Sequence, residues 1–146
     1  MADQTQGTIE IEASPGEILE VIADFDAYPD WVDGIKAAEV KEKGTDGRPS
    51  QVAFEFSAMG FNASYTLTYE WKPDDRGVSW TTVEASGAVK DVEGGYELEQ
   101  LNGDTEVTYR LAVELGVPVP GFLKRQGDKR AIKTALGGLK KRVEAR

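Results

Sequence analysis

Tyrosine and tryptophan supply most of the polar groups in this sequence that could act inside an apolar site. The chain has five tyrosines and three tryptophans among 146 residues, but no histidine and no cysteine. The absence of both residue types excludes serine triads with a histidine base, thiol nucleophiles, and zinc sites of histidine or thiolate ligands. Any acid–base chemistry would therefore fall to carboxylates, tyrosine, lysine or arginine.

The carboxylates form no recognisable catalytic or metal-binding pattern. Paired-carboxylate catalysis needs two acids that converge on one cavity, whereas Glu55, Glu70, Glu106 and Glu114 take the outward phase of their predicted strands. The aspartates near the first helix lack the glycine and glutamate that an EF-hand loop requires. We therefore predict no metal site and no cofactor, and we assign no catalytic residue.

The aromatic residues recur at every second position, a period typical of half-buried β-strands. The predicted inward face carries Phe54, Phe56, Tyr65, Tyr69, Trp80, Tyr96 and Tyr109. Buried tyrosine hydroxyls and indole N–H groups need hydrogen-bond partners. Several such groups on one face indicate a cavity with apolar walls and a few polar groups. The alternative is a packed core whose tyrosine hydroxyls reach the rim.

Hairpin signals separate the strand-like runs, which predicts an antiparallel meander with one face on the core. A short strand at 8–12 precedes the capping box Ser14-Pro15-Gly16-Glu17, which begins a helix, and a second short helix follows around Tyr28 and Trp31. Further strands are predicted at 35–43, 50–59, 61–71, 78–84, 88–101 and 105–115, before a long helix from Pro120. We expect an α+β helix-grip fold: a six- to seven-stranded antiparallel curved sheet that grips a long C-terminal helix, with two short helices after the first strand. Residues 1–146 would form a single domain.

The last helix is apolar only in its C-terminal half, where Ile132, Leu136, Leu139 and Val143 repeat at helical spacing. Its N-terminal half is mostly polar and cannot seal the sheet as a dry core would, which also favours a cavity. Gly137-Gly138 in its middle cost about 1 kcal/mol each relative to alanine. We interpret this pair as a close approach of the helix to the sheet, with a functional hinge as the alternative.

Charge is divided unevenly along the chain. From residue 121 onward nine Lys/Arg and two acids leave a net charge of +7, while the other 120 residues carry 8 basic and 24 acidic groups. The basic segment could be a patch for nucleic acid, phospholipid or an acidic carrier protein. We favour the alternative, a solvated helix face attracted to its own acidic body, because a chain of net charge −9 repels a polyanion at long range. Nucleic acid is therefore not an expected partner.

The sequence shows no targeting or membrane-spanning segment. Its first seven residues are polar, so no signal peptide is predicted. No apolar run approaches the roughly 18 residues of a membrane-spanning helix. We expect a cytoplasmic protein without stable membrane insertion.

Several short stretches, in their order and spacing, resemble the polyketide cyclase/dehydrase-like branch of the START/Bet v 1-like (SRPBCC) superfamily, particularly its small stand-alone actinobacterial members. The resemblance covers about residues 7–144. The stretches are Ala27-Tyr28-Pro29-Asp30-Trp31-Val32, Tyr69-Glu70-Trp71, Ser79-Trp80-Thr81, Glu93-Gly94-Gly95-Tyr96-Glu97-Leu98, Thr105-Glu106-Val107-Thr108-Tyr109, Val119-Pro120-Gly121-Phe122-Leu123-Lys124-Arg125 and Leu139-Lys140-Lys141-Arg142-Val143.

The resemblance implies a hydrophobic ligand cavity between the long helix and the sheet, but it implies no reaction, because the superfamily includes carriers, cyclases and lipid-transfer proteins. The function we favour is the binding or carrying of a small hydrophobic molecule, such as a polyketide, an isoprenoid or a lipid-like compound. The alternative is a polyketide aromatase/cyclase that performs aldol cyclisation and dehydration on a substrate bound to an acyl carrier protein. In that case tyrosine hydroxyls would act as weak acid–base groups, and arginine or lysine would stabilise an enolate.

The predicted ligand-binding residues come from the inner face of the sheet, the second short helix and the first half of the long helix. Tyrosine hydroxyls would orient the polar ends of the ligand, Trp80 and Phe56 would form walls, and Gln126 and Lys129 would lie near the mouth. The full set is Trp31, Phe54, Phe56, Tyr65, Leu67, Tyr69, Trp80, Tyr96, Tyr109, Leu111, Phe122, Gln126 and Lys129.

Overall fold

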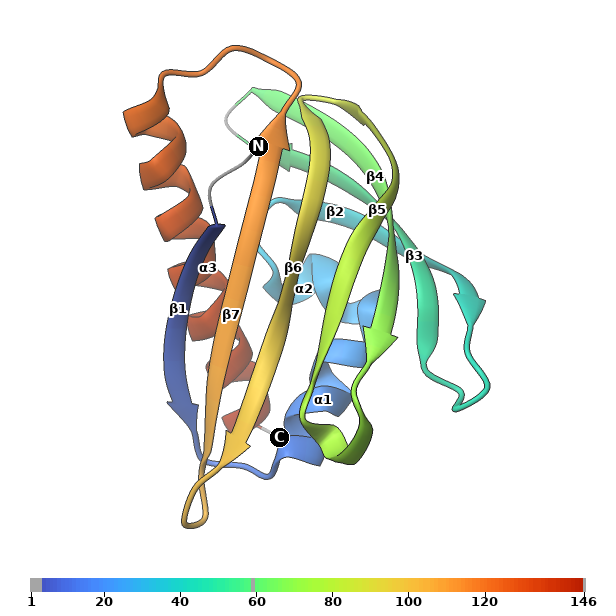
Figure 1. The fold of residues 1–146 in the computed structure, drawn as a ribbon, viewed down its shortest axis with the longest axis vertical. Helices are drawn as coiled ribbons and strands as arrows, with labels where there is room; N and C mark the ends of the chain where they lie inside the picture. Colours follow the sequence, from blue (N-terminus) through green and yellow to red (C-terminus); the bar gives the residue numbers. More distant parts are fainter. Residues whose placement is uncertain (1–3, 59, 146) are drawn as a thin grey trace.

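Seven β-strands form an antiparallel sheet that curves around the long C-terminal helix (Figure 1). The computed structural model describes residues 4–58 and 60–145. The strands are β1 (Gln4–Ile11), β2 (Ile35–Lys43), β3 (Pro49–Ala58), β4 (Phe61–Trp71), β5 (Gly77–Gly87), β6 (Val89–Gln100) and β7 (Thr105–Leu115). They lie in the order β1-β7-β6-β5-β4-β3-β2. The helices are α1 (Pro15–Ala23), η1 (Phe25–Ala27), α2 (Tyr28–Trp31), η2 (Pro73–Asp75) and α3 (Gly121–Glu144).

This arrangement confirms the predicted helix-grip fold, with seven strands and two short α-helices after the first strand. The first strand begins at Gln4 instead of residue 8, and β5 continues past residue 84 to Gly87. The predicted strand at 50–59 is β3, and its predicted last residue, Met59, lies outside the described residues. Within residues 4–58 and 60–145, no helix combines the length and apolar character that a bilayer span needs.

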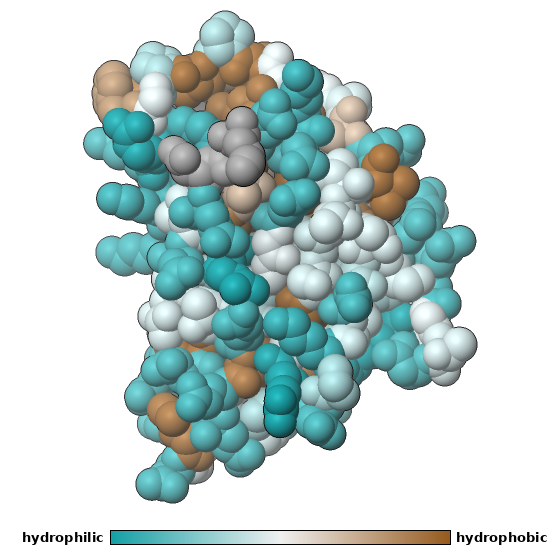
Figure 2. Space-filling view, in the orientation of Figure 1, coloured by the Kyte–Doolittle hydropathy of each residue, from teal (hydrophilic) through white to brown (hydrophobic). Residues whose placement is uncertain are grey.

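The two faces of the sheet differ in polarity. Seen from the outer side of β1, β7 and β6, the molecule is mostly hydrophilic, with apolar side chains concentrated near the upper end (Figure 2). The inner face supplies fully buried core residues such as Val52, Val78 and Val107. These pack with Ile132, Leu136, Leu139 and Val143 of α3, which are all buried. The C-terminal half of α3 thus fills the concave face, as its apolar spacing predicted.

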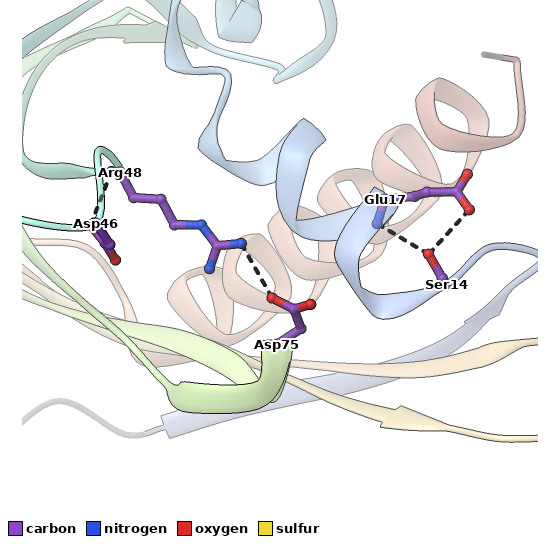
Figure 3. Close-up of polar contacts among 5 residues, drawn as sticks. All are labelled: Ser14, Glu17, Asp46, Arg48 and Asp75. Carbon is purple, nitrogen blue, oxygen red and sulfur yellow. Dashed lines mark hydrogen bonds and ion pairs between the residues drawn. The ribbon is translucent and has the colours of Figure 1, made fainter.

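Helix α1 closes one end of the sheet, and local capping explains where it begins. The Ser14 hydroxyl accepts a hydrogen bond from the Glu17 backbone N–H at 3.3 Å and donates one to the Glu17 carboxylate at 3.1 Å (Figure 3). Pro15 occupies the first turn, where its missing N–H leaves no hydrogen bond unmade. Ile18, Leu19 and Ile22 of α1 are completely buried, so α1 closes this end of the fold with tightly packed apolar side chains.

An ion pair joins two turns at the same end of the fold as α1. Arg48, after the β2–β3 turn, pairs with Asp75 of η2 at 3.2 Å, and its backbone N–H donates to Asp46 at 3.0 Å (Figure 3). The Asp75 carboxylate lies 3.3 Å from the position that a Cβ on Gly16 would occupy. These contacts bring the β2–β3 and β4–β5 turns up to the first turn of α1.

The close approach between helix and sheet occurs at Gly7 of β1, which corrects the interpretation of the glycine pair in α3. A Cβ on Gly7 would lie 2.7 Å from Cγ2 of Ile132. A Cβ on Gly138 would instead meet the backbone oxygen of Trp31 in α2 at 3.1 Å, and one on Gly137 would meet nothing within 4 Å. The sheet therefore approaches α3 through its own glycine, while Gly138 makes room for α2.

The sheet is not paired evenly between β5 and β6. Their ladder joins Gly77–Trp80 to Gly94–Glu97, and the recorded pairing stops at Trp80 and Gly94. Gly94-Gly95 lies where the neighbouring strand approaches closely, because a Cβ on Gly95 would lie 2.7 Å from the Val78 backbone oxygen. No bulge lies at this pair, because its register with β7 is regular. Beyond Trp80 the two strands diverge, and this divergence widens the concave side.

Candidate functional site

A cavity of about 360 Å³ lies between the concave face of the sheet and the first half of α3. Its wall includes the last residues of β3 and β7, Ala58 and Leu115, and the first residue of β6, Val89. Gly127 and Asp128 from the first half of α3 complete the wall. These positions lie at the end of the sheet opposite α1, so the cavity lies toward that end of the fold (Figure 1).

The structure brings nine of the sequence-predicted site residues together around this cavity. They come from β3 to β7 and supply most of the aromatic wall. They are Phe54, Phe56, Tyr65, Leu67, Tyr69, Trp80, Tyr96, Tyr109 and Leu111. Their alternation along the strands was the signal that found them.

Four predicted residues lie outside the lining. Phe122 is 59% exposed, and Gln126 and Lys129 are exposed. Helical geometry explains the difference, because each residue advances about 100° around the axis. Gln126 and Lys129 share a face that points away from the one formed by Gly127 and Ala131. The side chains of Gln126 and Lys129 therefore do not contribute to the cavity wall.

Trp31, the fourth of these residues, lines a separate crevice between the helices. Its neighbours there are Glu20, Val21, Asp24, Arg142 and Ala145. The Trp31 indole N–H is buried without a hydrogen-bond partner among the described residues. Its ring packs on Tyr28 at 5.2 Å between ring centroids, so Trp31 supports the cavity wall from behind.

Sequence reasoning missed further strand positions, the segment from α2 to β2 and the contribution of the long helix. The additional lining residues are Tyr28, Val32, Asp33, Ile35, Ala58, Val89, Val92, Val113, Leu115, Gly127, Asp128, Ala131, Thr134 and Ala135. The helical members follow the spacing 127, 131, 134 and 135, which is one face of a helix. This small-residue stripe could have been found by the same periodicity that identified the apolar stripe beside it.

The aromatic rings of the wall hold one another in place. Tyr96 and Tyr109 stack with ring centroids 4.7 Å apart, and Trp80 contacts them at 5.6 and 5.8 Å. Tyr69 continues the series against Trp80 at 5.7 Å. Aromatic pairs in such arrangements add about 0.5–1.5 kcal/mol each beyond simple burial. The wall is therefore a preformed surface whose hydroxyls have fixed positions.

Four tyrosine hydroxyls of this wall have no hydrogen-bond partner. The Tyr28 hydroxyl is satisfied, because it donates to the Ile22 backbone oxygen at 2.5 Å. Those of Tyr65, Tyr69, Tyr96 and Tyr109 bond to no residue within 4–58 and 60–145. Each of these four hydroxyl oxygens also keeps some solvent-accessible surface. Among the described residues, the side-chain polar atom that is fully enclosed and lacks a partner is the Trp31 indole nitrogen. These hydroxyls are free to bond to a molecule inside the cavity.

Burial keeps these tyrosines neutral. Desolvation raises the pKa of Tyr28, Tyr69, Tyr96 and Tyr109 well above the ordinary value of 10.0, and neighbouring tyrosines raise it further. Desolvation also raises the pKa of Tyr65. At neutral pH the hydroxyls can donate and accept hydrogen bonds, but they are poor bases.

Apart from the tyrosines, the ionisable groups of the described lining are Asp33 and Asp128. Asp128 pairs with Lys124 at 2.6 Å, and their side chains are 13% and 22% exposed. Arg110 of β7 pairs with Glu97 of β6 at 2.7 Å and does not line the cavity. The described lining contains no lysine or arginine, and no group of three metal-binding side chains occurs in the part of the chain that the structure covers.

Comparisons with known proteins agree with this architecture. A START superfamily protein from Mycobacterium smegmatis superposes with a TM-score of 0.86 at 24% identity, over 97% of both chains. The ZhuI aromatase/cyclase from Streptomyces sp. R1128 gives 0.81 at 15% identity, over 99% of this chain and 94% of that one. A STAR-related lipid transfer protein from Xanthomonas axonopodis gives 0.74 at 18% identity, over 97% of this chain and 85% of that fragment.

Because all three sequence identities are below 25%, these likenesses show a shared fold and carry no function over to this protein. A search of curated proteins finds no match to the sequence. A family profile described as polyketide cyclase / dehydrase and lipid transport matches residues 3–144. Since that profile spans nearly the whole chain, the protein belongs to the polyketide cyclase/dehydrase and lipid transport family.

Proposed function

We propose that the protein binds and carries a small hydrophobic molecule that bears a few oxygen atoms, such as a polyketide, an isoprenoid or a lipid-like compound. The observation that carries this proposal is the set of four unpartnered tyrosine hydroxyls in an otherwise apolar cavity. Apolar walls provide the driving force, roughly 25 cal/mol per Å² buried before the cost of association. The hydroxyls would orient the oxygens of the ligand.

The chemistry of the wall favours binding over catalysis. Aldol closure needs a base to form an enolate and a positive or hydrogen-bonding group to stabilise it. The tyrosines have raised pKa values and therefore stay protonated. The described lining holds no cation, and Asp128 is already paired with Lys124. A ligand could be held and shaped here without being activated.

The test is a binding assay on a pair of variants of α3. Ala131 lines the cavity, so Ala131→Trp places an indole into the ligand volume. Gln126→Trp adds the same side chain to the exposed side of the helix. Native mass spectrometry and displacement of an environment-sensitive dye are measured against fatty acids, isoprenoids and aromatic polyketides. We expect binding by wild type and Gln126→Trp, and at least a tenfold loss in Ala131→Trp. Equal binding by both variants, or no binding by any of the three proteins, would refute the proposal.

The second candidate is a polyketide aromatase/cyclase, which the likeness to the Streptomyces aromatase/cyclase supports. Its substrate would arrive on an acyl carrier protein. Incubation of a reactive poly-β-ketone mimic with and without the protein tests it. A changed ratio of cyclised products, lost in Ala131→Trp, would support the enzyme, and an unchanged ratio would reject it.

A further inference from the structure

The end of the molecule toward which the cavity lies carries an unusual share of exposed apolar side chains. Phe122 and Leu123, in the first turn of α3, are 59% and 47% exposed, and Phe61 at the start of β4 is 45% exposed. Figure 2 shows apolar side chains gathered at the end where Figure 1 places the β7–α3 connection. Among the described residues, the other exposed large apolar side chains, Val83 and Leu101, lie elsewhere.

Backbone hydrogen bonds join these segments into one surface. The Gly116 N–H, after β7, donates to the Ala88 oxygen at 2.9 Å, and the Ala88 N–H donates to the Asn62 oxygen at 2.9 Å. The first residues of β4, the β5–β6 turn and the β7–α3 connection are therefore neighbours. We call the surface formed by Phe61, Phe122 and Leu123 the apolar rim. Asp128 and Ala58 of the cavity wall belong to the same end of the fold.

Four positively charged side chains of α3 lie beside the apolar rim, without an ion pair to the residues that the structure describes. Arg125, Lys129, Arg130 and Lys133 are exposed on α3, and none forms an ion pair with a residue that the structure describes. The two ion pairs of α3, Lys124–Asp128 and Lys140–Glu144, are both internal to the helix. Within residues 4–58 and 60–145, the expected attraction between the helix and the acidic body therefore involves no ion pair between them.

We propose that the apolar rim and these four cations form a docking surface for an anionic lipid bilayer. Aromatic and aliphatic side chains enter the headgroup boundary of a membrane, and lysine and arginine beside them attract anionic lipids. A purely polyanionic partner such as nucleic acid would leave Phe122 and Leu123 in water. The long-range repulsion expected from the net charge of −9 is screened beyond about 8 Å at physiological salt, so it does not keep this face from an anionic surface.

Docking in this way would bring the bilayer against the first half of α3, whose other face lines the cavity. The ligand could then pass between the membrane and the cavity over a short path. This consequence rests on the proposed carrier function, whereas the docking itself does not. The two are separated by Ala131→Trp, which fills the cavity and leaves the apolar rim and the four cations unchanged.

The experiment is co-sedimentation with vesicles, without any added ligand. Phosphatidylcholine vesicles are compared with vesicles of phosphatidylcholine and phosphatidylglycerol in equal parts. We expect wild type and Ala131→Trp to bind only the anionic vesicles and to be released as salt rises. The double variant Phe122→Ser/Leu123→Ser and the triple variant Lys129→Glu/Arg130→Glu/Lys133→Glu should each bind at least tenfold more weakly.

Matched controls come from the opposite end of the molecule. Leu101→Ser removes an exposed leucine from the β6–β7 hairpin, and Lys141→Glu/Arg142→Glu reverses two exposed charges at the far end of α3. Both should bind vesicles as wild type does, and circular dichroism should show all variants folded. Equal loss in rim and control variants, or no vesicle binding by wild type, would overturn the proposal. So would capture of an acidic acyl carrier protein that depends on the same cations while vesicles are ignored.

Discussion

The side chain of Thr82 takes the place of a backbone partner for Val92. Its hydroxyl accepts a hydrogen bond from the Val92 N–H at 2.7 Å and donates one to the Val92 oxygen at 2.9 Å. This lies just past Trp80 and Gly94, where the recorded pairing of β5 with β6 stops. The threonine thus satisfies both backbone groups of Val92 while the strands move apart, and Val92 itself lines the cavity.

Thr82→Val should destabilise the protein because it leaves the N–H and oxygen of Val92 without partners. Unpaired buried backbone groups cost about 1–3 kcal/mol. Thr82→Ser keeps the hydroxyl and should lose less than half as much. Urea denaturation followed by circular dichroism measures both free energies of unfolding. Similar values for the two variants would show that the hydroxyl does not support the strand separation.

Gly94→Ala should also destabilise the fold, for a steric reason. A Cβ at Gly94 would overlap the Arg110 backbone oxygen and press on the Trp80 ring at 3.1 Å. Overpacking of this kind costs about 1–3 kcal/mol. Gly137→Ala is the matched control, because nothing lies within 4 Å of its added methyl group.

In the control, helix propensity should stabilise the protein by up to about 1 kcal/mol. The two alanine substitutions are therefore expected to shift the urea midpoint in opposite directions. A midpoint for Gly94→Ala equal to that of wild type would contradict the close approach described for β6 and β7.

The raised pKa values of the tyrosines lead to a prediction of how the stability of the protein changes at alkaline pH. Burial raises the pKa of all five above the unfolded value of 10.0. Below pH 10 both states hold their phenolic protons, so the tyrosines add no pH dependence. Above it the unfolded chain loses protons that the native state retains, and stability falls by about 1.4 kcal/mol per pH unit for each tyrosine.

We therefore expect tyrosinate absorbance to appear in one cooperative step, together with the loss of circular dichroism. The step should lie above pH 10 and move upward when a tight-binding ligand is present. Gradual ionisation near pH 10 in a protein that still gives a native circular dichroism spectrum would mean that the hydroxyls are in contact with bulk water.

Single tyrosine-to-phenylalanine variants test the hydroxyls as ligand contacts. Tyr96→Phe and Tyr109→Phe should weaken binding of an oxygenated ligand about 2- to 10-fold, the value of one hydrogen bond. Binding of a purely hydrocarbon probe to the same variants should not change, because the ring and its stacking remain. Dye displacement measures both affinities. Equal losses for both kinds of ligand would point to altered packing of the rings.

Alternation of residue types was enough to predict the fold and nine residues of the cavity wall. Tyr65, Leu67 and Tyr69 occupy successive inward positions of β4, and that phase follows from the pleat of a strand. The position of Trp31 could not be predicted in the same way. It is an aromatic residue on a one-turn helix, where no repeat of apolar residues shows which way its side chain points. It supports the wall from outside, packed on Tyr28 and Gly138.

The first half of α3 shows why composition alone did not identify the residues that line the cavity there. Gln126 and Lys129 are the polar residues there, and polar residues were expected where the cavity meets solvent. The structure turns them outward and gives the cavity Gly127, Ala131 and Thr134, whose small size leaves room for a ligand. Which face of a helix meets a cavity depends on how the following apolar turns dock on the sheet, and Ile132 against Gly7 determines that docking.

The contact of Gly7 with Ile132 also bears on how the chain acquires its structure during synthesis. Strand β1 leaves the ribosome first, yet its hydrogen-bonding partner is β7 and its packing partner is α3, the last elements to be made. Pairing between such distant segments is slow, because a long loop must be closed before any contact is gained. Until then β1 is an unpaired strand with an exposed edge, which is the form most open to aggregation or to a chaperone. The cavity wall is therefore complete only after α3 has been synthesised.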